Sequence, residues 1–187
     1  VWELDEGRYF SEFSPALHIV PPHEIPREWR RYLTIDYGLD MLAALWIAQS
    51  PDGRSVVYRE LYEPGLIISE AAARILSCEA SGEQIDFRLA TPDLWNRRQE
   101  TGRSAVELFA DCGLSFEKSS NERGAGGLAL HELLAPRRDM DGEPRPRLTI
   151  FNTCRNLIRT LPALQHDRRN PSDTANTPHE LTHAPDA

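Results

Sequence analysis

The chain has 187 residues, 40% of them hydrophobic, which is enough for one α/β domain with a packed core. No stretch approaches the roughly 18 consecutive apolar residues that a membrane span needs, and the first residues lack the basic start and apolar run of a signal peptide. The three cysteines, Cys78, Cys112 and Cys154, are odd in number and widely spaced, which fits a reducing compartment better than a disulfide framework.

The net charge of −8 by itself argues against a nucleic-acid partner. The distribution of the charge along the chain changes this interpretation. Residues 1–87 carry 7 basic and 15 acidic side chains, whereas residues 88–169 carry 14 basic and 11 acidic ones. Of the 21 basic residues, 20 are arginine, whose planar fork binds phosphate with two parallel hydrogen bonds. The second half of the chain is therefore compatible with contacts to a nucleic-acid backbone, and ordinary solvated arginines remain the alternative.

The first 30 residues are rich in proline and predict an irregular entry segment or linker. A meander of three strands is expected next, because short apolar segments alternate with turn residues. Its strands are "RYLTIDYG", "MLAALWIAQ" and "SVVYRELYEPG", and "SPDGR" forms the second turn.

The remaining elements alternate between helices and strands. Apolar residues at helical spacing predict helices in "LIISEAAARILSCEA", "SAVELFADCG", "GGLALHELLA" and "NTCRNLIRTL". The last of these is expected to be capped by Asn152 or Thr153. Strands are predicted in "QIDFRLATPD", ending at Asp93, and in "RLTIF", with a charged hairpin or loop in "PRRDMDGEPRPR". The order of elements predicts a mixed α/β sheet flanked by helices.

Two aspartates lie at positions where burial of an ionised carboxylate costs free energy. Asp36 follows Leu33-Thr34-Ile35 at the end of an expected central strand, and Asp93 ends the strand after the first long helix. Neighbouring strand ends could bring the two together, and their oxygens are the ligands that Mg²⁺ and Mn²⁺ prefer. Two such ions about 4 Å apart activate a water and stabilise the leaving oxygen of a phosphodiester. A third acid is available in Asp186.

Five segments, in this order, resemble those of the C-terminal nuclease domain of the tailed-bacteriophage terminase large subunit, the DNA-packaging motor. They are "YLTIDYGLDMLAALWIAQSPDGRSVVYRELYEPG", "ATPDLWNRRQETGRSAVELFADCGL", "SSNERGAGGLALHELL", "LTIFNTCRNLIRTLPALQHD" and "HELTHAPDA". The resemblance implies a ribonuclease-H-like fold over residues 31–187, preceded by the entry segment 1–30. It also implies that the chain is a metal-dependent endonuclease, which cleaves double-stranded DNA concatemers by a two-metal mechanism with Mg²⁺ or Mn²⁺.

The same resemblance implies roles for individual residues. Asp36, Asp93 and Asp186 match the family's three catalytic and metal-binding aspartates, and His183 matches a nearby histidine with an auxiliary role. Asp173 lies where related proteins often carry further acids. Arginines that flank the acids are expected to contact the DNA backbone without reading its sequence; these are Arg97, Arg98, Arg103 and Arg123.

The expected partners are double-stranded DNA, an N-terminal ATPase domain, the small terminase subunit and the portal. The expected location is the host cytoplasm at the procapsid portal, with no membrane. The phosphate-binding pattern G-x-x-x-x-G-K-[ST] does not occur in this sequence, so the ATPase domain is expected to lie outside it.

Three other interpretations compete with the nuclease. His179-Glu180-Leu181-Thr182-His183 has the letters of the zinc-protease pattern H-E-x-x-H, but Pro185 would break the helix that the pattern requires. "IDYG" resembles the phosphate loop of actin-like ATPases and sugar kinases, which bind nucleotide between two such lobes. A non-catalytic docking module of the packaging motor is the third possibility.

Overall fold

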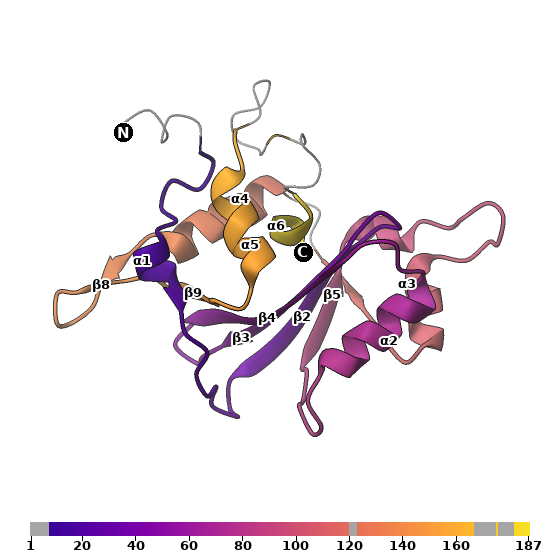
Figure 1. Cartoon of the computed structure of the whole chain (residues 1–187), viewed down its shortest axis with the longest axis horizontal. Coiled ribbons are helices and arrows are strands. Elements are labelled where there is room, and N and C mark those ends of the chain that lie inside the picture. Colours follow the sequence, from indigo (N-terminus) through magenta and orange to yellow (C-terminus); the bar gives the residue numbers. More distant parts are fainter. Residues whose placement is uncertain (1–7, 120–122, 167–174, 176–181) are drawn as a thin grey trace.

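The computed structural model describes residues 8–119, 123–166, 175 and 182–187. Figure 1 shows a central sheet with α2 and α3 on one face and α4, α5 and α6 on the other. Within the described residues, no helix is both long and apolar enough to cross a membrane.

The sheet is mixed, as the sequence predicts, and its seven strands have the order β1-β9-β4-β3-β2-β5-β6. The meander β2-β3-β4 is antiparallel, whereas β5 and β6 continue it in parallel beside β2, and β9 and β1 beside β4. The strands are β1 (Ile19–Val20), β2 (Arg30–Tyr37), β3 (Leu42–Gln49), β4 (Ser55–Glu63), β5 (Phe87–Ala90), β6 (Glu117–Lys118) and β9 (Leu148–Phe151). The predicted charged hairpin forms from β7 (Arg137–Arg138) and β8 (Pro144–Arg145).

Three helices are shorter than their predicted segments, the helix that begins at Arg123 starts three residues earlier than predicted, and those at Pro15–His18 and His183–Asp186 were not predicted. The helices are α1 (Pro15–His18), α2 (Ile68–Cys78), α3 (Ala105–Asp111), α4 (Arg123–Leu134), α5 (Arg155–Thr160) and α6 (His183–Asp186), with 3₁₀ turns η1 (Pro92–Trp95) and η2 (Leu161–Ala163). In α2 the buried residues Ile68, Ala71, Ala72 and Ile75 recur at helical spacing and turn one face toward the sheet.

The burial of β2 and β3 explains why they lie at the centre of the sheet. In β2, Leu33, Ile35 and Tyr37 are buried on one face, so Thr34 and Asp36 must point to the other face. In β3, five consecutive residues from Leu42 to Trp46 are buried, which is typical of a strand covered on both sides. The strand that carries Asp36 is thus held rigidly between β3 and β5.

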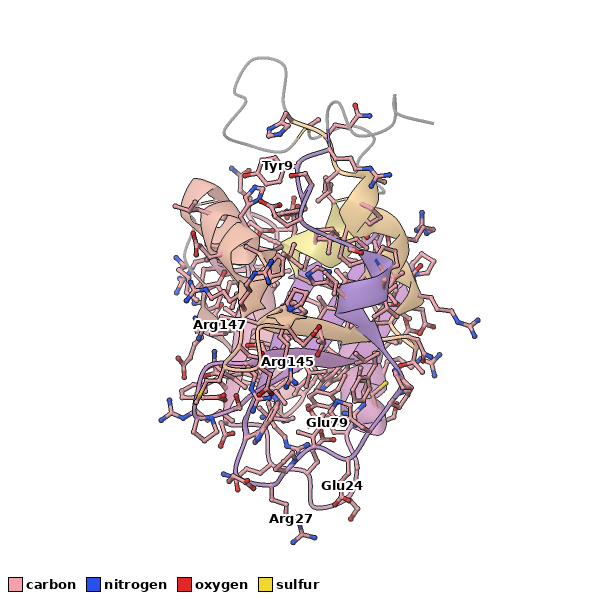
Figure 2. The ribbon with its side chains drawn as sticks, turned by 90° about the vertical axis from the view of Figure 1, so that its left-hand side faces the viewer. Tyr9, Glu24, Arg27, Glu79, Arg145 and Arg147 are labelled. Carbon is pink, nitrogen blue, oxygen red and sulfur yellow. The ribbon has the colours of Figure 1, made fainter. Side chains whose placement is uncertain are left out.

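The entry segment is less irregular than its prolines suggest. Tyr9, Phe10 and Phe13 are buried in the core, and β1 pairs in parallel with β9. A side chain at Gly127 in α4 would overlap the Tyr9 hydroxyl, so this glycine allows the close approach of the segment to the helix. Figure 2 shows Tyr9 near the top of the view and Glu24 and Arg27 at the bottom, so the segment crosses the molecule from one side to the other.

Two local predictions were wrong. The strand before Asp93 ends at Ala90, because Pro92 has no N–H for the ladder and begins the 3₁₀ turn η1, which contains Asp93. Neither Asn152 nor Thr153 caps α5, whose N-cap residue is Cys154 without a side-chain cap. The free N–H groups of Asn156 and Leu157 instead donate to the carboxylate of Glu60 in β4, at 2.9 and 2.6 Å.

Candidate active site at the carboxyl end of strand β2

Asp36 lies at the carboxyl end of β2, on the face of the sheet that α6 covers. Its neighbour Tyr37 faces the opposite side, where its ring meets that of Phe109 in α3 edge to face, with centroids 5.3 Å apart. The side chain of Asp36 is 20% exposed, although Ile35 before it is almost fully buried. A carboxylate in such a position needs hydrogen bonds or a cation to remain ionised at low cost.

His183 supplies one of these partners. Its ring nitrogen Nδ1 lies 2.8 Å from Asp36 Oδ2, and the imidazole is only 7% exposed. The contact joins residues 147 positions apart in the sequence. The pairing of these two side chains was not predicted from the sequence, although each was singled out separately.

Asp40 also lies at this site, although it is not among the residues predicted from the sequence. Its Oδ2 lies 3.3 Å from His183 Nε2, so the imidazole faces one carboxylate at each ring nitrogen. Asp40 belongs to the short connection between β2 and β3, where an aspartate would normally be assigned to the turn. The available signal was its position four residues after Asp36, at the same end of the hairpin.

Asp93 lies at the same end of the sheet as Asp36. Because β5 runs parallel to β2 and Ala90 pairs with Ile35, the carboxyl ends of both strands meet at one edge, and η1 begins there. Asp93 is exposed to solvent. A carboxylate here can therefore reach a ligand from solvent without a large desolvation cost.

Asp186 is carried by α6, one turn after His183. The helix packs against β2, β3 and α5, and Ala184 within it is fully buried. Asp186 is half-buried. In the parts of the chain that the structure describes, no three His, Cys, Asp or Glu side chains form a group able to hold a metal ion. The structure thus brings Asp36 and His183 into contact, but it does not join Asp93 and Asp186 with them in a preformed group of ligands.

The chemistry of this region fits hard divalent cations. Asp36, Asp93 and Asp186 offer oxygen donors of the kind that Mg²⁺ and Mn²⁺ bind. The hydroxyls of Thr34 and Thr91, each two residues before an aspartate, are buried without a hydrogen-bond partner in the described structure. Such hydroxyls suit the water shell that Mg²⁺ usually keeps.

The arginines expected to bind DNA divide into two kinds. Arg97 lies 3.8 Å from Glu107, and Arg103 lies 2.7 Å from Asp111, so both are paired with acids of α3. Hydrogen bonds from the backbone and hydroxyl of Ser104, together with the nearby arginines, lower the pKa of Glu107 and keep it ionised.

Arg98 differs from these two because no carboxylate of the described residues lies within ion-pair distance of it. Burial raises the pKa of Tyr37, which points to the α3 face of the sheet, and the charge of Arg98 opposes part of that rise. Among the other expected residues, the side chain of Arg123 lies outside the described side chains, and Asp173 and His179 lie outside the described residues.

Comparisons with known proteins give no match in sequence and clear matches in structure. No protein-family model and no curated protein matches the sequence. The nuclease domain of the P22 large terminase superposes with a TM-score of 0.71 at 16% identity, over 97% of this chain and 90% of that one. The large terminase of the thermophilic bacteriophage D6E, in complex with ADP, gives a TM-score of 0.74 at 15% identity, over 100% of this chain and 44% of its own.

The large terminase nuclease of the thermophilic phage G20c also has this fold. With bound magnesium it matches at a TM-score of 0.58 and 12% identity, over 91% of this chain and 87% of that one, and it was solved with bound cobalt as well. The chain therefore has the ribonuclease-H-like architecture of the large-terminase nuclease domains, as its resemblance to that family implies. It spans less than half of the D6E protein.

Proposed function

We propose that this chain is the nuclease domain of a terminase large subunit and cleaves double-stranded DNA with Mg²⁺ or Mn²⁺. One observation carries the proposal: a half-buried carboxylate, Asp36, ends a central strand of a terminase-nuclease fold, and α6 brings His183 against it. The metal-bound G20c nuclease supports a divalent ion in this type of domain.

Asp36, Asp93 and Asp186 would hold the ions, and we propose two of them. When bound, the ions would supply an activated water and stabilise the charge on the departing oxygen. The protein's own part is to hold Asp36 in a fixed orientation through His183 and to keep acidic oxygens at one open end of the sheet.

Partners and location follow from the same proposal. The D6E large terminase was solved with ADP, and this chain spans 44% of it, which supports an ATPase domain elsewhere in the full protein. We infer that the domain acts at the procapsid portal in the host cytoplasm, on DNA concatemers and together with the small subunit.

The test of this function is plasmid nicking by the purified chain. With Mg²⁺ or Mn²⁺ we expect supercoiled plasmid to become relaxed and then linear, and an excess of chelator should abolish both products. Gel electrophoresis over a metal titration provides the measurement. Intact plasmid at every metal concentration, from a chain that still binds DNA, would favour the docking module. Cleavage that persists in chelator would exclude a metal-dependent nuclease.

A second prediction separates the arginines. Arg98→Ala should weaken binding to duplex DNA by roughly tenfold at 50 mM salt and reduce the slope of log K against log salt by about 0.9, which is the loss of one phosphate contact. Arg97→Ala and Arg103→Ala should change the slope less, because α3 already pairs their charges. Fluorescence anisotropy over a salt series measures all three variants. A larger effect of Arg97→Ala than of Arg98→Ala would contradict the assignment.

A further inference from the structure

The imidazole of His183 lies between two carboxylates of a single hairpin. Asp36 Oδ2 is 2.8 Å from its Nδ1 and Asp40 Oδ2 is 3.3 Å from its Nε2. Carboxylate oxygens accept hydrogen bonds, so each ring nitrogen has an acceptor nearby. Asp36 is the last residue but one of β2 and Asp40 lies in the connection to β3, which means that both contacts hold the ring at the same end of the sheet.

The position of α6 depends on such side-chain contacts. The helix has only four residues, and its backbone bonds are Asp186 N to Thr182 O, at 2.8 Å, and Ala187 N to His183 O, at 3.1 Å. A segment this short is not stable as a helix by itself. Burial of Ala184 and the two contacts of His183 therefore contribute to holding it, and Asp186 with it, against β2 and β3.

Gly38 makes room for the second contact. A Cβ at this position would overlap Asp40 Oδ1, whereas glycine lets the carboxylate fold back beside the backbone of the hairpin. The connection is also closed by a hydrogen bond from Gly38 N to Met41 O, at 2.8 Å. The backbone of Gly38 does not have a positive φ, so alanine fits the main chain and would displace only the side chain of Asp40.

We propose that Asp40 is a positioning residue: through His183 it orients the imidazole toward Asp36 and sets the place of Asp186 on α6. The orientation of His183 by Asp40 does not depend on the proposed nuclease function, whereas its effect on metal-dependent cleavage rests on that function. Asp40 is 65% exposed and its contact with His183 is long, so its loss should loosen α6 without unfolding the domain.

The structural part is tested without metal or DNA. In chain labelled with ¹⁵N-histidine, at one fixed pH, Asp40→Asn and Gly38→Ala should both shift the Nε2 resonance of His183, which His183→Ala identifies. Asp141→Asn is the matched control, because it removes one exposed negative charge from the β7-β8 hairpin, away from α6. An unchanged His183 resonance in both Asp40→Asn and Gly38→Ala would overturn the proposal.

The functional part is tested by plasmid nicking over a Mn²⁺ titration. Asp40→Asn should raise the metal concentration for half-maximal nicking about two- to fivefold, as expected for a partly exposed contact, and leave the rate at saturating metal within twofold of wild type. Gly38→Ala should do the same, and the double variant should add nothing, because both changes remove one contact.

The outcomes separate the two proposals. Suppose that Asp36→Asn is inactive but that Asp40→Asn and Gly38→Ala give the same metal titration curve as wild type. That result would overturn the role of Asp40 and leave the nuclease function standing. Unchanged nicking by Asp36→Asn would overturn the nuclease function, and the NMR comparison would still decide whether Asp40 orients His183.

Discussion

Asp36→Asn should lower the rate of metal-dependent plasmid nicking by about 10³-fold or more. Asparagine keeps the shape of the side chain but removes the negative charge, at the central position among the proposed ligands. Metal-assisted charge stabilisation supplies several kcal/mol of a phosphodiester barrier, and each 1.36 kcal/mol corresponds to tenfold in rate. The loss should appear in Mg²⁺ and in Mn²⁺ alike, as measured by initial rates of loss of supercoiled plasmid.

The matched control is Asp86→Asn. Asp86 lies at the opposite end of the same two parallel strands, where its carboxylate accepts a hydrogen bond from Arg31 N–H at 2.8 Å. This variant loses the same charge from an exposed position and should nick at the wild-type rate. Circular dichroism must show both variants folded. Nicking by folded Asp36→Asn within threefold of wild type would rule out the mechanism proposed for this carboxylate.

Glu83→Gln should lower the free energy of unfolding far more than a substitution at an exposed glutamate. The Glu83 side chain is only 5% exposed, and its carboxylate accepts hydrogen bonds from the Tyr58 hydroxyl at 2.7 Å and from Arg59 at 2.9 Å. The N–H of Ala80 donates to it as well, at 2.9 Å. Burial and Glu83 raise the pKa of Tyr58, so its hydroxyl remains a donor. A glutamine amide cannot accept at both ends, and the variant leaves one buried donor unpaired.

We expect Glu83→Gln to lower the free energy of unfolding at pH 7 by about 2 kcal/mol. Burial opposes ionisation of Glu83, but the bonds from Tyr58, Ala80 and Arg59 outweigh it and lower its pKa below the ordinary 4.5. A lowered folded-state pKa stabilises the fold above the unfolded pKa, and this stabilisation is lost as the pH falls through the folded value. The difference between variant and wild type should therefore shrink in acid.

Urea unfolding at pH 7 and at about pH 3 measures both free energies. Glu24→Gln serves as the control, since Glu24 is exposed at the end of the molecule seen in Figure 2 and should change stability by less than about 0.5 kcal/mol. A difference between Glu83→Gln and wild type that persists undiminished in acid would show that the charge of Glu83 is not the stabilising feature.

The alternation of apolar residues was sufficient to predict the meander. Leu33, Ile35 and Tyr37 have the period of a half-buried strand, and the run Leu42–Trp46 has the composition of a central one. The turn "SPDGR" and the spacing of apolar residues in α2 are equally local signals. The resemblance also led to the terminase-nuclease fold, which the structural matches confirm although identities are near 15%.

Local pattern did not predict the features that depend on distant partners. The free N–H groups at the start of α5 donate to Glu60, which is 96 residues before Asn156, whereas neither of the nearby residues Asn152 and Thr153 caps the helix. Nothing in the sequence near residue 40 indicates that Asp40 meets a histidine from the other end of the chain.

The sequence by itself determined the order and kind of β2 to β5, of β9 and of α2 to α5, because these depend on periodic burial within short segments, but it did not indicate β1, β6, α1 or α6. It also identified the three aspartates whose role remains a prediction. Only the tertiary structure decided that His183 contacts Asp36 and Asp40, and that Arg98 differs from Arg97 and Arg103. The physical reason is that hydrogen bonds and ion pairs act over a few ångströms, and packing of the whole chain selects which distant side chains come within that range.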